Sequence, residues 1–335
     1  MADNTPIEWA DATVNAINGC SVLSPGCKYC YAMKLAGTRL KHHPSRAALT
    51  VDTKAGPVWT GEVRLHEPAL FQPLRWRRSR TIFWNAHGDT FHEAVPDEWI
   101  DRMFAAMALT PRHKHLVLTK RSSRMRAYFT ARSSGHAVWR AMEGLAQNQQ
   151  QAHIRDSWYG GPVGKWPLPN VWLGVSAEDQ ARADERIPDL LATPAAGRFL
   201  SCEPLLGPID LTSITLPTCT QKFDALVGMG WGLQSERYGG GRLHHGATKS
   251  PYGKIDGIIV GGESGPDARP MRAAWARSLR DQCAVAGVDF HFKQWGEFRP
   301  TSDCNGPYMM RVGKRSAGRD LDGVIHDALP WRRAA

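Results

Sequence analysis

The sequence predicts an α/β protein: a complete or partial β/α (TIM-like) barrel with parallel strands and loop insertions. Its 335 residues, 42% of them hydrophobic, are enough to bury one large core. Apolar segments with strand character alternate along the chain with segments of helical periodicity. The strand segments are almost continuously apolar, which is typical of parallel strands covered by helices. A doubly wound open sheet is the alternative fold with the same pattern.

Helical patterns separate the predicted strands. One predicted helix covers 96–109 and stops at Pro111, and another ends at Gly287, a residue that readily adopts the left-handed conformation of a helix end. Ser176 and Asp179 resemble a capping box, which would begin a helix after the fourth strand. The predicted strands lie within 12–17, 81–89, 115–121, 170–179, 197–205, 255–265 and 288–296.

Two segments interrupt this alternation. Residues 132–168 contain a short helical pattern and then a loop rich in Gly, Pro and Trp, and residues 207–254 contain a Gly-rich stretch typical of an insertion. We therefore predict a barrel domain over 1–296, with insertions at about 132–168 and 207–254. A C-terminal extension follows over 297–335.

The chain is basic, with 42 Lys and Arg against 32 Asp and Glu and a formal net charge of +10. Clustered positive charge attracts polyanions because neutralised phosphates release counterions, so nucleic acid (DNA or RNA) is a candidate partner. The N-terminal residues lack a secretory pattern, and no apolar run approaches the roughly 20 residues that span a bilayer. We expect a soluble, cytoplasmic protein with no membrane partner, whose seven cysteines are reduced.

Polar residues follow the predicted strands one after another. In parallel β/α folds the active site lies at the carboxyl ends of the strands, so we expect these residues to line a ligand site. Gly261 and Gly262 would let a ligand approach the backbone closely. The strand-end candidates are Asp89, Lys120, Arg121, Ser176, Glu178, Glu203, Gly261, Gly262, Glu263, Lys293 and Trp295.

Three cysteines lie close together in "NGCSVLSPGCKYCYAMKL", residues 18–35. Cys20, Cys27 and Cys30 include a Cys-x-x-Cys pair, which presents two thiolates to a metal. A structural zinc site requires a fourth ligand, for which His42 and His43 are candidates. A [4Fe–4S] cluster held by three thiolates leaves one iron open to an outside ligand, and three is then the complete number.

This loop resembles that of the radical S-adenosylmethionine superfamily. Members place three cysteines after the first barrel strand, usually as C-x3-C-x2-C, with an aromatic residue before the last. Here Tyr29 takes the aromatic position, Cys27 and Cys30 match, and six residues separate Cys20 from Cys27. The segments "IEWADATVNAINGCSVLSPGCKYCYA", "LPNVWLGVSAEDQARADERIP", "FLSCEPLLGP", "IIVGGESGPDARPM" and "FHFKQWG" resemble an uncharacterised, phage-associated family of radical-enzyme-like proteins.

The resemblance implies a chemistry and a role for each candidate. Cys20, Cys27 and Cys30 would hold a [4Fe–4S] cluster that binds S-adenosyl-L-methionine. An electron from a donor such as flavodoxin or ferredoxin would then cleave this cofactor to a 5′-deoxyadenosyl radical. Tyr29 would lie near the adenine. The other candidate cofactor contacts are Ser176, Glu178, Glu203, Gly261, Gly262 and Glu263, and the substrate candidates are Asp89, Lys120, Arg121, Lys293 and Trp295.

The sequence thus predicts a radical enzyme that modifies or repairs a nucleic acid or nucleotide. The alternatives are a radical enzyme acting on a peptide or small metabolite, and a non-catalytic, metal-stabilised nucleic-acid-binding protein. A base must leave its duplex to reach such a site. Trp158, Tyr159 and Trp166 are candidates to stack an extruded base, or else they anchor loops.

Overall fold

The computed structural model describes residues 5–133, 135–159, 166–216, 222–234, 244–249, 253–304 and 306–332. The chain divides into two compact units. Unit 1 comprises Met1–Val175 with Thr193–Gly197, and unit 2 comprises Ser176–Ala192 with Arg198–Ala335. The predicted boundary between a barrel over 1–296 and an extension over 297–335 stays a prediction.

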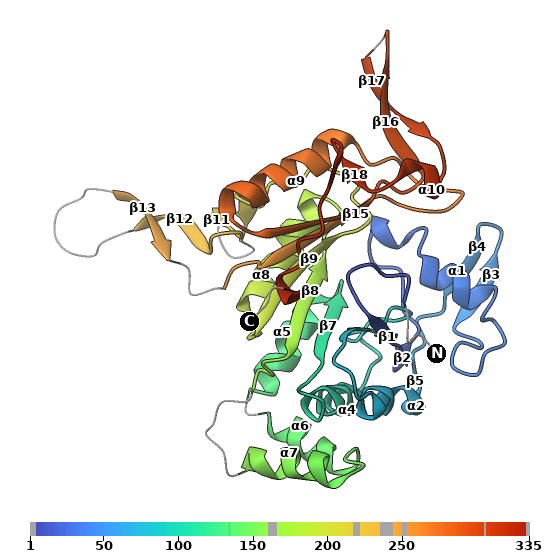
Figure 1. Ribbon diagram of the computed structural model, residues 1–335, viewed down its shortest axis with the longest axis vertical. Coiled ribbons are helices and arrows are strands. Elements are labelled where there is room, and N and C mark those ends of the chain that lie inside the picture. Colours follow the sequence, from blue (N-terminus) through green and yellow to red (C-terminus); the bar gives the residue numbers. More distant parts are fainter. Residues whose placement is uncertain are drawn as a thin grey trace. The chain divides into compact units, whose positions relative to one another are not determined.

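A seven-stranded parallel sheet forms a partial β/α barrel (Figure 1). Its order is β1-β6-β7-β8-β9-β14-β15. The predicted α/β class with parallel strands is therefore confirmed, and the barrel is the partial one of the two forms expected. The strands are β1 (Ala12–Val14), β6 (Thr81–Trp84), β7 (Lys114–Thr119), β8 (Val171–Ser176), β9 (Gly197–Cys202), β14 (Gly257–Gly261) and β15 (Asp289–Gln294).

Smaller antiparallel pairs accompany this sheet. They form four two-stranded sheets, in which β2 pairs with β5, β3 with β4, β16 with β17 and β18 with β19. Their bounds are β2 (Ile17–Asn18), β3 (Thr50–Thr53), β4 (Gly56–Trp59), β5 (Arg64–Leu65), β16 (Phe298–Asp303), β17 (Gly306–Arg311), β18 (Asp320–Leu321) and β19 (Val324–Ile325).

The longer helices follow the predicted strand–helix alternation. None in the described part of the chain has the length and apolar character that crossing a membrane requires. The helices are α1 (Tyr31–Gly37), α2 (Glu67–Leu70), α3 (Gln72–Arg75), α4 (Asp97–Ala108), α5 (Ser122–Ala131), α6 (His136–Glu143), α7 (Gln149–Tyr159), α8 (Gln180–Ala192), α9 (Ala273–Ala286) and α10 (Lys314–Ala317), with short 3-10 turns η1 (Pro25–Cys27) and η2 (Pro330–Arg332).

In unit 1, helix α4 shows why these residues form these elements. Asp97 and Glu98 occupy its first turn, where negative charge is favourable beside the positive end of the helix dipole. Ile100, Met103 and Phe104 recur at helical spacing and are fully or almost fully buried. Burial of such side chains contributes about 1.5–3 kcal/mol each, so α4 is a main source of the core of this unit.

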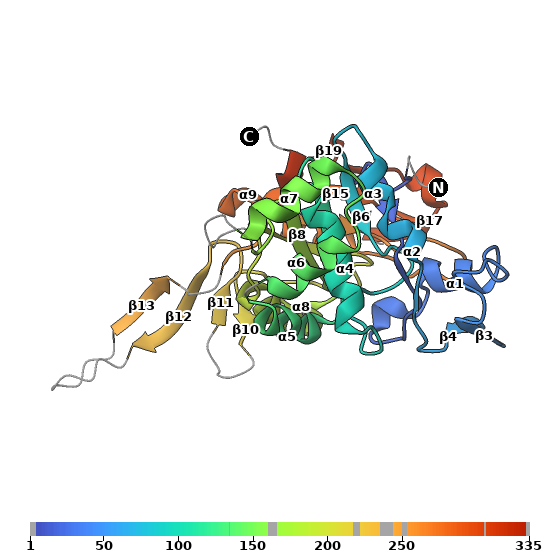
Figure 2. The ribbon, with the colours of Figure 1, turned by 90° about the horizontal axis from the view of Figure 1, so that it is seen from below.

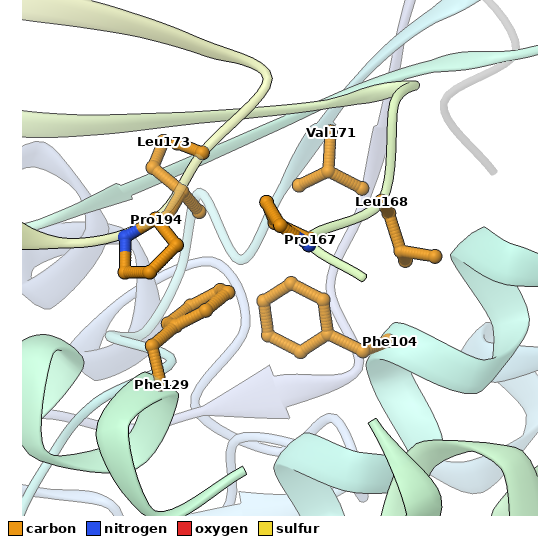
Figure 3. Close-up of a pocket in the computed structure, with 8 residues that line it drawn as sticks. Phe104, Phe129, Pro167, Leu168, Val171, Leu173 and Pro194 are labelled. Carbon is orange, nitrogen blue, oxygen red and sulfur yellow. The ribbon is translucent and has the colours of Figure 1, made fainter. Parts of the chain in front are cut away.

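The core of unit 1 also encloses the small apolar hollow of Figure 3. The rings of Phe104 and Phe129 point toward Pro167 and Pro194 there (Figure 3). The space is too tight for a water molecule, and no charged side chain lines it. We therefore assign it to core packing and not to ligand binding.

In unit 2, two helix ends test the predicted caps. Asp179 Oδ1 accepts a hydrogen bond from the backbone N–H of Arg182 at 2.9 Å, so Asp179 caps helix α8. The predicted capping box beginning at Ser176 is wrong, because Ser176 is the last residue of β8. Helix α9 ends at Gly287 in the left-handed conformation, with φ 64°, as predicted.

The two predicted insertions have regular structure of their own. Residues 132–168 contain helices α6 and α7. Residues 207–254 contain an antiparallel sheet of order β10-β11-β12-β13, separate from the parallel sheet (Figure 2). Its strands are β10 (Ile214–Thr215), β11 (Lys222–Asp224), β12 (Met229–Gln234) and β13 (His244–Lys249).

Candidate functional site

The cysteine loop lies in unit 1, between strand β2 and helix α1. Cys27 ends the turn η1, and Cys30 directly precedes α1 as its N-cap. Gly19, next to Cys20, has φ 96°, and a Cβ atom there would lie 2.2 Å from the carbonyl oxygen of Glu62. Only glycine fits this position, so the backbone fixes where the loop begins.

The three loop thiols are free and half-buried. Burial and then the charge of Asp89 raise the pKa of Cys20 to about 12, and burial raises the pKa of Cys30. Cys27 and Cys30 lie near enough for their charges to raise the pKa of Cys20 further. Reactive cysteines have lowered pKa values, so Cys20 and Cys30 are not activated nucleophiles in this state.

Arg121 ties the loop to the end of strand β7. Its Nη1 donates to Cys20 Sγ at 3.5 Å, and its Nη2 donates to Ser21 Oγ at 2.6 Å. The same guanidinium forms ion pairs with Asp89 at 3.1 Å and with Glu93 at 2.8 Å. Five N–H groups in a fixed fork make arginine suited to this multiple role.

Asp89 is held equally firmly from the ends of strands β6 and β7. Its carboxylate accepts hydrogen bonds from Thr119 Oγ1 at 2.6 Å, from the backbone N–H of Phe91 at 3.0 Å and from that of Lys120 at 3.2 Å. Lys120 lies near enough for its charge to lower the pKa of Cys30. Three predicted strand-end residues, Asp89, Lys120 and Arg121, therefore gather at the cysteine loop.

The predicted substrate role fits these three residues unequally. Asp89 and Arg121 are 6% and 5% exposed and are paired with each other, so neither presents its charge to a substrate. Lys120 is half-buried. Asp89 and Arg121 position the loop, and Lys120 is the one of the three that remains a candidate contact.

The loop also exposes apolar side chains to solvent. Val22, Leu23 and Tyr31 are 51%, 43% and 59% exposed, although large hydrophobic side chains are usually buried. The hydroxyl of Tyr31 donates to the carbonyl oxygen of Ala86 at 2.8 Å, which fixes the ring. Tyr29, predicted near an adenine, is half-buried, with Lys28 Nζ 5.1 Å from its ring centre. Exposed apolar groups around a loop mark a surface on which another molecule can lie.

The structure does not place a fourth zinc ligand beside the three cysteines in the described part of the chain. Across the described ranges, no three or more His, Cys, Asp or Glu side chains are placed to hold a metal ion. His43 directs its Nδ1 at Ser45 Oγ, at 2.7 Å, and not at a cysteine. A finger-like site made from the three thiols and His42 or His43 is therefore not formed in the described part of the chain.

Unit 2 carries the second group of predicted strand-end residues. Lys293 Nζ and Glu203 Oε1 form an ion pair at 2.9 Å, with side chains 22% and 15% exposed. A Cβ atom on Gly261 would lie 2.5 Å from Glu203 Oε1, so the glycine leaves room for that carboxylate. The structure thus brings Glu203, Gly261 and Lys293 together as a partly exposed polar group.

Two predicted cofactor contacts in unit 2 are buried and contact the same arginine. Glu178 is buried, and its Oε2 accepts from Arg186 Nη1 at 2.9 Å. The same nitrogen donates to the carbonyl oxygen of Ser176 at 2.8 Å. Glu178 and Ser176 anchor helix α8, and the carboxylate of Glu178 is not offered to a ligand in this structure.

Three other predicted site residues, at the ends of β14 and β15, also make their contacts inside unit 2. Glu263 is 7% exposed and forms two hydrogen bonds with the guanidinium of Arg269, at 2.8 and 2.7 Å. Trp295 is 2% exposed and donates its Nε1–H to the carbonyl oxygen of Asp320. A Cβ atom on Gly262 would lie 1.9 Å from the carbonyl oxygen of Trp295, so this glycine serves backbone packing. In this structure these residues make their contacts inside unit 2, and their role toward a ligand stays a prediction.

The three aromatic residues proposed to stack a base have different surroundings in the structure. Trp166 stacks on Phe129, with ring centres 5.2 Å apart and an interplanar angle of 15°, and therefore anchors its loop. Trp158 is half-buried on α7. The side chain of Tyr159 and the whole of Cys219 lie outside the described residues.

A basic cluster in unit 1 could not be recognised from the sequence. Arg46 is 7% exposed, and its Nη2 lies 2.7 Å from His87 Nδ1. Ser45 and His43 continue this chain of hydrogen bonds. The only signal was the basic run "KHHPSR" (41–46), which does not reveal that its arginine is buried.

Comparisons with known proteins identify a family but no activity. A family model described as "Protein of unknown function (DUF5131)" matches residues 4–330, so the chain belongs to the DUF5131 family. No curated protein and no solved structure matches the sequence. The family description names no cofactor or reaction, so the likeness to radical S-adenosylmethionine enzymes stays a prediction.

Proposed function

We propose that this member of the DUF5131 family is a radical S-adenosylmethionine enzyme that modifies or repairs a nucleic acid or a nucleotide. The observation that carries the proposal is the cysteine loop. Cys20, Cys27 and Cys30 lie on one loop after the first strands of unit 1, are half-buried, and influence one another electrostatically. The superfamily resemblance requires three thiols on such a loop, and here the gap between Cys20 and Cys27 is longer than usual.

The donor set fits a cluster better than it fits one ion. Each thiolate of a [4Fe–4S] cluster bonds a different iron, so the three sulfurs do not need to meet at one point. Nearby positive charge favours thiolates: the charge of Arg121 lowers the pKa of Cys20 and that of Lys120 lowers the pKa of Cys30, against the larger effect of burial. We therefore expect Cys20, Cys27 and Cys30 to hold the cluster.

A bound cluster with an open iron would supply one-electron cleavage of S-adenosyl-L-methionine. The chain's own residues perform the remaining tasks. Asp89 and Arg121 hold the start of the loop through Ser21 and Cys20. The exposed side chains of Val22, Leu23 and Tyr31 would cover apolar parts of the bound molecules and exclude water.

The nucleic-acid substrate is supported by charge. The net charge is +10, and the half-buried Lys120 lies near Cys30. In unit 2, the ion pair of Glu203 and Lys293 is partly exposed, unlike the buried Glu178 and Glu263.

The test is anaerobic preparation of the full chain followed by metal analysis. We expect about four irons and four sulfides per chain, a brown colour, and release of 5′-deoxyadenosine from S-adenosylmethionine under reducing conditions. Cys20→Ala, Cys27→Ala and Cys30→Ala should each abolish both. Cys304→Ala is the matched control, because Cys304 is exposed and lies in unit 2.

Each departure from this result has a definite meaning. A colourless protein with one zinc per chain would contradict the proposal and favour a metal-stabilised binding protein. Cluster without cleavage of S-adenosylmethionine would remove the enzymatic part of the proposal. An equal loss of iron in Cys304→Ala would show that the loop is not the specific site.

A further inference from the structure

We propose that a buried basic cluster in unit 1, made of His43, Ser45, Arg46 and His87, binds the phosphate group of a nucleotide or nucleic acid. The contacts and burial of these four residues support a binding site for an oxyanion such as phosphate. The identification of the phosphate as that of a nucleotide rests on the proposed function.

Arg46 is a buried cation whose contacts carry no negative charge. It is 7% exposed; its Nη2 donates to His87 Nδ1 at 2.7 Å, and its Nη1 donates to Ser45 Oγ. Its buried Nε has no hydrogen-bond acceptor among the residues that the structure describes. Burial lowers the pKa of Arg46 to about 10, and no acidic side chain opposes that shift. A buried charge without a counterion is strongly unfavourable, so this arrangement calls for an anion.

The surroundings of Arg46 add positive charge. The rings of His43 and His66 lie 6.4 Å apart, and Arg64 Nη1 donates to two carbonyl oxygens of the segment that holds Arg46. Burial, followed by the charge of Arg46, lowers the pKa values of His66 and His87, the latter to about 4. His66 and His87 are therefore neutral at pH 7, and the positive charge of this region comes from Arg46 and Arg64.

Three carboxylates on neighbouring segments are already paired with other cations. Glu67 pairs with Arg102, and Asp52 pairs with Lys41 at 2.5 Å. Asp89, two residues beyond His87 in the sequence, pairs with Arg121. An external anion is therefore the counterion that Arg46 can still acquire.

The donors suit a phosphate group. Arginine has five N–H donors arranged in a fork, of which Arg46 uses two in the contacts above. His87 Nδ1 accepts from Arg46, so its hydrogen is on Nε2 and can be donated to a ligand. His43 is exposed, which places the rim of the cluster at the surface.

The cluster borders the cysteine loop. The backbone N–H of Gly19 donates to the carbonyl oxygen of His87 at 3.1 Å, and Gly19 directly precedes Cys20. A phosphate held by Arg46 and His87 would thus anchor a substrate beside the proposed cluster.

The test compares phosphate with chloride at equal ionic strength, using the full chain. Inorganic phosphate at 10 mM should raise the melting temperature of the wild type by at least about 2 °C, and equilibrium dialysis should detect bound phosphate. Arg46→Gln should weaken phosphate binding roughly tenfold or more. In chloride, this variant should be as stable as the wild type or more so, because it removes an uncompensated buried charge. Arg102→Gln is the matched control and should respond to phosphate like the wild type.

A structural role for Arg46 predicts the opposite pattern. Failure of Arg46→Gln to fold in chloride, or an equal loss of stability in both buffers, would overturn the proposal. So would absence of phosphate binding by the wild type, or unchanged binding in both Arg46→Gln and His87→Gln. Comparing a 5′-mononucleotide with an oligonucleotide lacking terminal phosphates then distinguishes a monoester from a diester source. None of these readouts requires iron, so failure here is distinguishable from failure of the cluster.

Discussion

Arg121 shows how one residue can connect two strand ends with a loop. Its guanidinium contacts Cys20, Ser21, Asp89 and Glu93, and its side chain is 3% exposed. Replacing both partners of a buried ion pair can be harmless, whereas removing one partner leaves an uncompensated charge. Arg121 therefore holds the loop through its contacts and through the neutralisation of Asp89.

We predict that Arg121→Ala lowers the free energy of unfolding by about 3–5 kcal/mol, because Asp89 would remain buried without a counterion. Urea denaturation followed by tryptophan fluorescence measures the change. Arg124→Ala is the matched control: its ion pair with Asp97 is about one quarter exposed and should contribute about 0–1 kcal/mol. Similar losses in the two variants would contradict the structural role of Arg121.

The sequence predicted which residues gather at the strand ends but not which of them stay available. Asp89, Lys120 and Arg121 follow two strands in the sequence and lie together in the structure, because parallel strands end on one edge of their sheet. Spacing along the chain does not show that Glu178 meets Arg186, or that Arg46 is buried without an acid. Those contacts depend on residues brought together by tertiary packing, and they decide whether a charge binds a ligand or stabilises the fold.

At the scale of elements, the strands were predictable and the caps less so. The apolar strand runs form the parallel sheet because burial on both faces favours such segments. Within that sheet, strand β7 contains a buried histidine that its apolar neighbours conceal. His115 Nδ1 accepts from Trp84 Nε1–H at 3.0 Å, so its hydrogen lies on Nε2, which faces Thr110 Oγ1 at 3.1 Å. The ring is neutral, and burial, followed by the charge of His113, lowers its pKa to about 3.

We predict that acid destabilises the strand pair β6–β7 through His115. The unfolded histidine binds a proton near pH 6.5 and the folded one near pH 3. Its contribution to stability is therefore complete above about pH 6.5 and is lost as the pH falls toward 3. Each such histidine contributes a slope of at most about 1.4 kcal/mol per pH unit.

The measurement is the urea midpoint between pH 7.5 and pH 5.0. His115→Gln should reduce the free energy of unfolding at pH 7.5. Unfolding of this variant should also take up about one proton fewer at acidic pH, so its free energy of unfolding should change less steeply with pH. Equal slopes in the variant and the wild type would show that His115 does not resist protonation in the folded chain. Between pH 7.5 and 8.5, the wild type should show no change that depends on His115.

At the scale of the whole molecule, positive charge is the property that most favours a polyanionic substrate. Of the 42 Lys and Arg side chains, many form ion pairs with acidic side chains, so their charges largely cancel at a distance and the net charge is +10. Lys120 differs in its position, at the end of β7 and beside Cys30. Replacing Lys120 therefore tests whether nucleic acid reaches the cysteine loop, because binding there should weaken when this charge is lost.

We predict that the full chain binds single-stranded oligonucleotides with an affinity that falls as salt rises. Each phosphate contacted adds about −0.7 to the slope of the logarithm of the association constant against the logarithm of salt concentration. Lys120→Ala should weaken binding and reduce that slope by about 0.7, whereas Lys222→Ala, an exposed lysine of β11, should leave it unchanged. Arg121 is unsuitable for this test because its loss disturbs the loop itself.

Fluorescence anisotropy of a labelled oligonucleotide at several salt concentrations gives both the affinity and its salt dependence. If the wild type does not bind at low salt, or Lys120→Ala binds with the same slope, a peptide or small metabolite becomes the better substrate for the cysteine-loop site.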